Sequence, residues 1–307
     1  MLPLHLLSDR KLRETDALLV GSFMPYSGAD AGMPSFLFIA TVANFVFIGR
    51  SVRDCTSKKS PVSKPTAVSL LLTAVAESIW VLPCFIQCVL VFFKGHGGDW
   101  APDLNSEGCD IQGYYSFAGS LAAMLASLLM AFVTLRLTRS NEPPPLKTVL
   151  GLCAAVLATA LFIGAFPLMH IGRFAYLGEG FCYADFNDTG TIVLMMITII
   201  PTVITVLALH TKLYLEGAWP KKITLLMSFA FLTAWILWIP AFFIGLAGAS
   251  FPKGYFISGA ILGHAQALVN PILYGIFWRA SAIQMDRSRQ QVALTSKSDD
   301  EIERGAP

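Results

Sequence analysis

Apolar stretches long enough to cross a lipid bilayer constrain this 307-residue chain more than any other feature. A membrane-crossing helix needs about 20 mostly apolar residues, because backbone groups in hydrocarbon must bond one another. The sequence predicts an all-α membrane protein, a bundle of seven transmembrane helices. The predicted spans are 29–50, 66–93, 110–136, 148–169, 189–210, 223–248 and 255–277. Polar and helix-breaking residues dilute the start of the first stretch, so six spans plus an interfacial N-terminal segment is the alternative.

The composition excludes several classes of protein. Hydrophobic residues make up 55% of the chain and charged residues 14%, unlike an ordinary soluble enzyme. A net charge of +2 provides no basic field for a nucleic-acid backbone, so we expect no nucleic-acid partner. The six cysteines form no CxxC pair and the five histidines fall in separate segments. We therefore expect no metal site, no cofactor and no enzymatic activity.

The distribution of basic residues predicts the orientation. Lys and Arg in short loops resist translocation and mark the cytoplasmic side. The first, third and fifth loops hold eleven of them, whereas the N-terminus and the other loops together hold six. The N-terminus is therefore predicted outside and the C-terminus inside. The eleven are Arg50, Arg53, Lys58, Lys59, Lys64, Arg136, Arg139, Lys147, Lys212, Lys221 and Lys222.

This topology divides the chain into four parts. Residues 1–28 form an extracellular N-terminus and residues 29–277 form the transmembrane domain. Residues 278–292 combine apolar and basic side chains, typical of a short amphipathic helix lying on lipid. Residues 293–307 are polar and charged, which predicts a disordered cytoplasmic tail.

Two features of the predicted outer loops agree with the orientation. Asn187-Asp188-Thr189 is an N-glycosylation sequon, so Asn187 is a candidate acceptor. Cys109 and Cys182 lie in or beside outer loops, where oxidising conditions permit a disulfide from the top of the third span to the loop before the fifth. Two unpaired thiols are the alternative.

Polar side chains inside the spans are few. Buried polar groups in lipid are costly, so they usually face other helices or a wet cavity and mark function. Asn44 lies in the first span and Glu77 in the second. Gln266, Asn270 and Tyr274 recur every four residues in the seventh, hence on one helix face. We expect that face to look inward.

Asn270-Pro271-Ile272-Leu273-Tyr274 resembles the Asn-Pro-x-x-Tyr motif of rhodopsin-like (class A) G-protein-coupled receptors. The resemblance covers residues 29 to about 285. Trp238-Ile239-Pro240, Pro201, Asn44 and the pair Cys109 and Cys182 support it. The segment 109–115 is similar to the start of the third span in opsins, and the loop around residues 167–182 is similar to the second outer loop of opsins and prostanoid receptors. The retinal-attachment position holds His264 rather than Lys, so covalent retinal is not expected.

The resemblance implies a receptor at the plasma membrane that couples to a heterotrimeric G protein. Ligand binding would bias the sixth helix outward, with Pro240 and Pro271 as candidate hinges and Tyr274 rearranging below. No carboxylate lies near Ser116, so a small apolar or lipid-like ligand is expected rather than an amine. Passive proline kinks are the alternative to hinges. The implied ligand-binding residues in the outer half of the bundle are Ser116, Phe117, Ser120, Trp238, Phe242 and His264.

Departures from the family pattern bear on mechanism. Val133-Thr134-Leu135 stands where the family has an acidic residue, Arg and Tyr, with Arg136 one place late. A receptor-like protein without G-protein coupling, acting as a decoy or as the partner of another receptor, is therefore an alternative, and a membrane transporter is another. Asn44, Glu77, Gln266 and Asn270 are expected to meet in mid-bundle. Because Ala123 offers no hydroxyl, a protonated Glu77 is favoured there over the sodium ion that the family holds.

Overall fold

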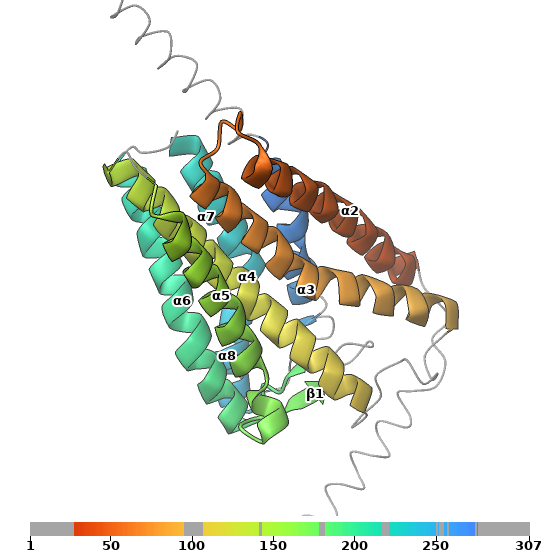
Figure 1. Cartoon of the computed structure of the whole chain (residues 1–307). Helices are drawn as coiled ribbons and strands as arrows, with labels where there is room; N and C mark the ends of the chain where they lie inside the picture. The colour runs from red at the N-terminus through yellow and green to blue at the C-terminus, as the bar shows by residue number, and fades with distance from the viewer. Residues whose placement is uncertain are drawn as a thin grey trace, which may run out of the picture.

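The computed structural model describes residues 28–94, 107–140, 143–177, 182–216, 221–249, 251, 255–256, 258–273 and 275. Its architecture is a bundle of long helices with one small β-hairpin (Figure 1). The predicted N-terminus up to residue 27, the surface helix 278–292, the tail 293–307 and Tyr274 lie outside the described residues.

Long apolar helices make up most of the chain because each apolar run satisfies its own backbone hydrogen bonds. Six described stretches are long and apolar enough to cross a membrane. The prediction of a helical multi-pass membrane protein is thereby confirmed. The helices are α2 (Gly28–Thr56), α3 (Lys64–Lys94), α4 (Glu107–Ser140), α5 (Leu146–Gly164), α6 (Thr189–Leu215), α7 (Lys221–Trp235) and α8 (Trp238–Leu246).

The seventh predicted span, 255–277, is described in part. It is helical at residues 255–256, 258–273 and 275, and residues 258–273 are called the last helix below. The number of seven spans and the orientation of the chain both stay predictions.

The sixth predicted span is broken in two. A turn at Ile236 and Leu237 separates α7 from α8. Pro240 explains its place, because proline removes the bond to residue i−4, here Ile236, and its ring clashes with that carbonyl. By contrast, α6 continues through Pro201 without interruption.

A hairpin lies in the loop between α5 and α6, an addition to the predicted all-α fold. Strands β1 (Phe174–Tyr176) and β2 (Cys182–Ala184) pair antiparallel, with Tyr176 opposite Cys182. A short 3₁₀ turn, η1 (Phe166–Met169), precedes them. Asp188 caps the N-terminus of α6, accepting a bond of 2.8 Å from the backbone nitrogen of Thr191.

The two ends of the bundle have different characters. We call the end with β1 and β2 the hairpin end, drawn at the bottom of Figure 1. The opposite end has loop 57–63 and most of the Lys and Arg of the first, third and fifth loops, and we call it the basic end. The helices run alternately between these ends, as the sequence predicts.

Candidate functional site

A polar junction lies in the middle of the bundle. Asn44 on α2 donates bonds of 2.9 Å to the Ala74 carbonyl and to the Ser78 hydroxyl on α3. Asn270 on the last helix donates a bond of 3.2 Å to Glu77 Oε1, also on α3. Polar side chains of the first and last predicted spans therefore both bond to one segment of α3, which is the second predicted span.

The junction contains more hydrogen-bonding capacity than the described chain satisfies. Glu77 is 1% exposed, and its Oε2 has no hydrogen-bond partner among the described residues. The same holds for Asn44 Oδ1 and Gln266 Oε1. Buried acceptors without partners are costly, so each of these oxygens favours a donor from outside the described residues.

Trp80 lies one helical turn from Glu77, toward the hairpin end. It is wedged between two glycines, where an added Cβ on Gly263 would lie 2.3 Å from its ring and one on Gly119 would lie 2.8 Å from its Cβ. The imidazole of His264 packs on the same indole, with ring centroids 4.2 Å apart. Side chains therefore fill the interior on the side of Glu77 that faces the hairpin end.

An aromatic cluster fills the half of the bundle near the hairpin end. Residues 182–186, which we call the plug, comprise β2 and the two residues after it, and all five are buried. The phenol ring of Tyr183 lies 4.7 Å from the Trp238 ring, and its hydroxyl is 2.9 Å from the Ser120 hydroxyl. The ring centroid of Phe186 lies 5.9 Å from that of Phe242 and 5.4 Å from that of Phe256. Burial raises the pKa of the Tyr183 phenol, which therefore stays a neutral hydrogen-bonding group.

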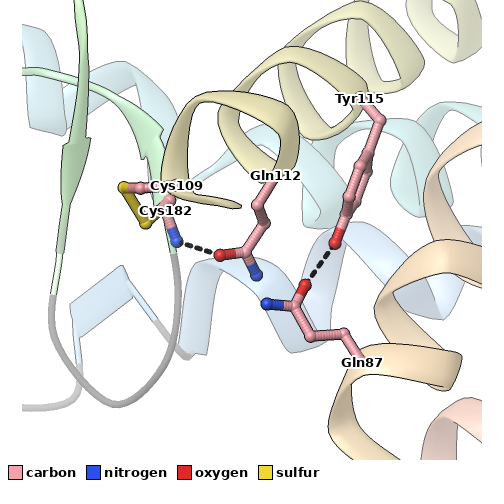
Figure 2. The surroundings of a disulfide bond; sticks show 5 residues. All are labelled: Gln87, Cys109, Gln112, Tyr115 and Cys182. Carbon is pink, nitrogen blue, oxygen red and sulfur yellow. Dashed lines mark hydrogen bonds between the residues drawn. A yellow bond between two sulfur atoms is a disulfide. The ribbon is translucent and has the colours of Figure 1, made fainter. Parts of the chain in front are cut away.

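A disulfide holds the plug in place. Cys109 at the start of α4 is bonded to Cys182 in β2, which confirms the predicted pair over two unpaired thiols. Figure 2 shows the polar side chains beside it, with Gln112 accepting a bond of 2.8 Å from the Cys182 nitrogen and Tyr115 donating to Gln87 of α3. Asp185 pairs with Arg173 at 2.7 Å, which ties the plug to the segment before β1.

A cavity of about 60 Å³ opens in the other half of the bundle. Several of its apolar lining residues also pack in the hydrophobic cluster around Val62 of loop 57–63, which places it toward the basic end. Its polar lining comes from four helices and consists of Thr73, Ser127, His210, Gln266 and Asn270. Its apolar lining consists of Phe47, Leu70, Met130, Met227, Phe231 and Leu273.

Two cross-helix contacts close the basic end around this cavity. His210 Nδ1 on α6 lies 3.2 Å from the Ser228 hydroxyl on α7. At the surface, Arg139 in the last turn of α4 makes a two-point ion pair with Glu216 after α6, the closest approach being 2.6 Å. Bonding to Arg139 holds the pKa of Glu216 below its ordinary value.

The structure places the predicted ligand-binding residues in the interior, at most 1% exposed. They do not line an open chamber, because the plug and Trp80 pack against them. The open space described above lies in the other half instead. The set comprises Ser116, Phe117, Ser120, Trp238, Phe242 and His264, and their role as ligand contacts stays a prediction.

Sequence reasoning missed four side chains that shape the site. Tyr183 and Phe186 fill the expected chamber, Trp80 closes the polar junction, and His210 lines the cavity. One signal was in the sequence: glycines at 119, 245 and 263 lie within apolar spans, where they permit close approach of another group. Their partners could not be identified from spacing alone.

The described residues contain no group of three or more His, Cys, Asp or Glu side chains placed to hold a metal ion. Comparison of the sequence with models of known protein families finds no match, and comparison with curated proteins finds no significant relative.

Proposed function

We propose that the protein is a rhodopsin-like G-protein-coupled receptor of the plasma membrane. It would transmit binding of a small apolar or lipid-like ligand to a heterotrimeric G protein by outward movement of the inner half of its sixth span. The single observation that supports this most is the contact from Asn270 of the Asn-Pro-x-x-Tyr segment to Glu77, beneath the Trp238 cluster.

The break in the sixth span supplies the moving part. Between α7 and α8 the helix lacks continuous backbone bonding, so α7 can swing about Ile236 and Leu237 while α8 stays packed on the plug. The His210 to Ser228 contact holds α7 against α6 in the described state. A ligand that binds the swung state more tightly shifts the population by that difference in affinity.

The ligand chemistry follows from the surroundings of Trp238. The buried cluster there is aromatic and aliphatic, and Ser116 takes the place of a carboxylate that would pair with an amine. An apolar ligand would enter by displacing Tyr183 and Phe186 or by packing beside them. Neither nitrogen of His264 has a hydrogen-bond partner among the described residues, so its imidazole is available to one polar group of the ligand.

A proton on Glu77, rather than a bound sodium ion, fits this donor set. Asn270 directs its amide NH₂ at Glu77 Oε1, and Ala123 supplies no hydroxyl from α4. A protonated carboxyl avoids the cost of a buried charge at Glu77, which is 1% exposed and has no cationic partner among the described residues. Strong dependence of receptor activity on sodium concentration would contradict this assignment.

A G-protein dissociation assay in cells, run with a panel of lipid ligands, tests the proposal. Wild type should respond to at least one lipid, and Asn270→Ala and Tyr274→Ala should lose the response at equal surface expression. Thr205→Ala is the matched control, because its side chain is exposed on α6 and bonds only within that helix. Equal responses of all four proteins would refute the role of the motif.

A receptor-like protein without coupling is the second candidate. It is favoured by Val133, Thr134 and Leu135, which are all buried in the bundle, and by the engagement of Arg139 with Glu216. If no G-protein class responds to any lipid while the protein reaches the surface and binds one of them, this candidate replaces the first.

Glycosylation tests the proposed orientation. Asn187 is exposed at the hairpin end, directly before the residue that caps α6. If the hairpin end faces outward, treatment with an endoglycosidase should shift the mobility of wild type on a gel but not that of Asn187→Gln. A wild-type chain that is unaffected by the enzyme argues against use of this site.

A further inference from the structure

The turn that connects α5 to β1 presents apolar side chains to its surroundings. Leu168, Met169 and Ile171 are 45%, 50% and 48% exposed. They belong to residues 166–171, which comprise η1 and the two residues after it, at the hairpin end of the bundle (Figure 1). We call these residues the apolar turn. Three exposed apolar side chains so close together indicate contact with something other than water.

A loop at the opposite end of the bundle shows the arrangement that is usual for a segment in water. In loop 57–63 the exposed side chains are Lys58 and Lys59. The apolar side chain of Val62 is 6% exposed and packs in a hydrophobic cluster. The apolar turn reverses this arrangement, so its exposed side chains are not simply the result of lying in a short loop.

The apolar turn is held in place at both of its ends. Pro167 is buried. Gly172, with φ 89°, lies so close to Thr191 that an added Cβ would be 2.6 Å from the threonine hydroxyl oxygen. Between them His170 adopts the left-handed conformation, with φ 62°, and reverses the direction of the chain. The turn is therefore a fixed structure that keeps its apolar side chains outward.

The backbone of the apolar turn is suited to an apolar environment. The backbone nitrogens of Met169, His170 and Ile171 donate to carbonyls at the start of the same turn, at 3.2, 3.2 and 3.0 Å. A segment that lies in lipid must satisfy its own backbone groups, because no water is present to do so. A loop in water has no such requirement.

The length of α5 places the apolar turn at the boundary between hydrocarbon and headgroups. The 19 residues of α5 measure about 28 Å along the helix axis. The hydrocarbon core of a bilayer is about 30 Å thick. Lys147, exposed in the first turn of α5, fixes that end of the helix at the headgroups of the basic end. The chain therefore reaches the other boundary where η1 begins.

The exposed apolar surface of α5 continues into this turn. Phe162, in the last turn of α5, is 61% exposed, and its ring centroid lies 5.0 Å from that of Phe166 in η1. On the other side of the turn, the side chain of Arg173 is 65% exposed while its Nε pairs with Asp185. Apolar side chains beside an exposed cation are typical of segments at a membrane surface, where the cation meets the lipid phosphates.

We propose that the apolar turn is a lipid-binding site that inserts Leu168, Met169 and Ile171 into the leaflet at the hairpin end. Its partner is the boundary between the acyl chains and the headgroups of that leaflet. Arg173 joins the inserted turn to the plug through Asp185, so the same contact fixes the depth of the plug relative to the bilayer. This binding is independent of the proposed receptor function.

Spin labelling in phosphatidylcholine nanodiscs tests the insertion. The free cysteines 55, 84, 88 and 153 are replaced by alanine, with the disulfide kept, and a nitroxide is attached to Met169→Cys or Ile171→Cys. Collisions of the label with oxygen, which concentrates in hydrocarbon, should exceed those with a water-soluble nickel complex several-fold. Asn187→Cys is the matched control, because Asn187 is exposed at the same end of the bundle, and it should show the reverse.

Each outcome decides the proposal. Dominant oxygen collisions at residues 169 and 171, but not at 187, support insertion. Nickel collisions as frequent as those at residue 187 would overturn it, because the side chains would then lie in water. Rare collisions with both reagents would also overturn it, since a partner protein or a second copy would then cover the turn. Thermal unfolding shows that each labelled protein is folded, and a misfolded variant at one position leaves the other to decide.

Discussion

The two halves of the bundle differ in how their interiors are filled. Near the hairpin end, rings interlock with glycines and with the plug, so that Trp80, Trp238 and Phe186 have no free space around them. Near the basic end, helices enclose a cavity with a mixed polar and apolar lining. Close packing resists change in shape, whereas a lined cavity permits side chains to rearrange at small cost. Under the proposed function, the hairpin half would set the frame and the basic half would provide the movement.

Breaking the disulfide should have the largest effect on this comparison. Replacing Cys109 and Cys182 together by serine frees the plug, and loss of a native disulfide typically costs about 2–5 kcal/mol. Thermal unfolding in detergent, followed by intrinsic fluorescence, should show a clear fall in Tm. Cys153→Ser is the control, since that cysteine is unbonded on α5. Equal Tm values for the two proteins would mean that the plug is held by packing alone.

Adding one methyl group to the hairpin half should have the next largest effect. In Gly245→Ala the new Cβ would lie 2.1 Å from the Phe186 carbonyl oxygen, a backbone atom that cannot turn aside. Such overpacking costs about 1–3 kcal/mol or more. Gly49→Ala is the matched helical control, with nothing within 4 Å of its Cβ, and should be neutral or slightly stabilising. Similar Tm values for both variants would show that the plug yields easily.

Removing one hydroxyl in the plug sharpens the comparison further. Tyr183→Phe keeps the ring against Trp238 but loses the bond to Ser120, which should cost about 1 kcal/mol. A double-mutant cycle with Ser120→Ala isolates that bond. A coupling energy near zero would indicate that the two hydroxyls act independently.

The ion pair at the basic end should give the smallest effect, because it is exposed to solvent. The pKa of Glu216 is lowered in the folded protein, so its contribution to stability is present above the ordinary carboxyl pKa and is lost as the pH falls through the lowered value. Glu216→Gln should therefore lower Tm slightly at neutral pH and not at all in acid. High salt should shrink the neutral-pH difference. A difference that persists in acid would contradict the assignment to charge.

Local chemistry explains which parts of the structure could be predicted from the sequence. The helices followed from runs of apolar residues, and Pro240 marks the break because a missing backbone bond acts within one turn. The disulfide followed from two cysteines placed at the same end by topology. Asn44 and Asn270 both bond to the α3 segment around Glu77, as expected for groups that are costly in lipid, whereas the oxygen of Gln266 has no hydrogen-bond partner among the described residues.

The filling of the interior could not be predicted, because it depends on contacts between distant segments. Tyr183 and Phe186 belong to a short loop, and its sequence does not indicate how deeply the loop enters the bundle. In the sequence Trp80 is one apolar residue among many in the second span, and only the structure shows that Gly119 and Gly263 pack against it. The expected chamber was therefore placed where the loop packs, and the cavity of the other half was missed.

The covalent link from α4 to the plug has a consequence for pharmacology. A segment joined to the chain whose interior it fills competes with a free molecule at a fixed effective concentration that dilution cannot reduce. If the proposed receptor function holds, a diffusible ligand directed at Trp238 would meet this built-in competitor, and its apparent potency should improve when a reducing agent opens the disulfide and leaves the plug held only by its own loop.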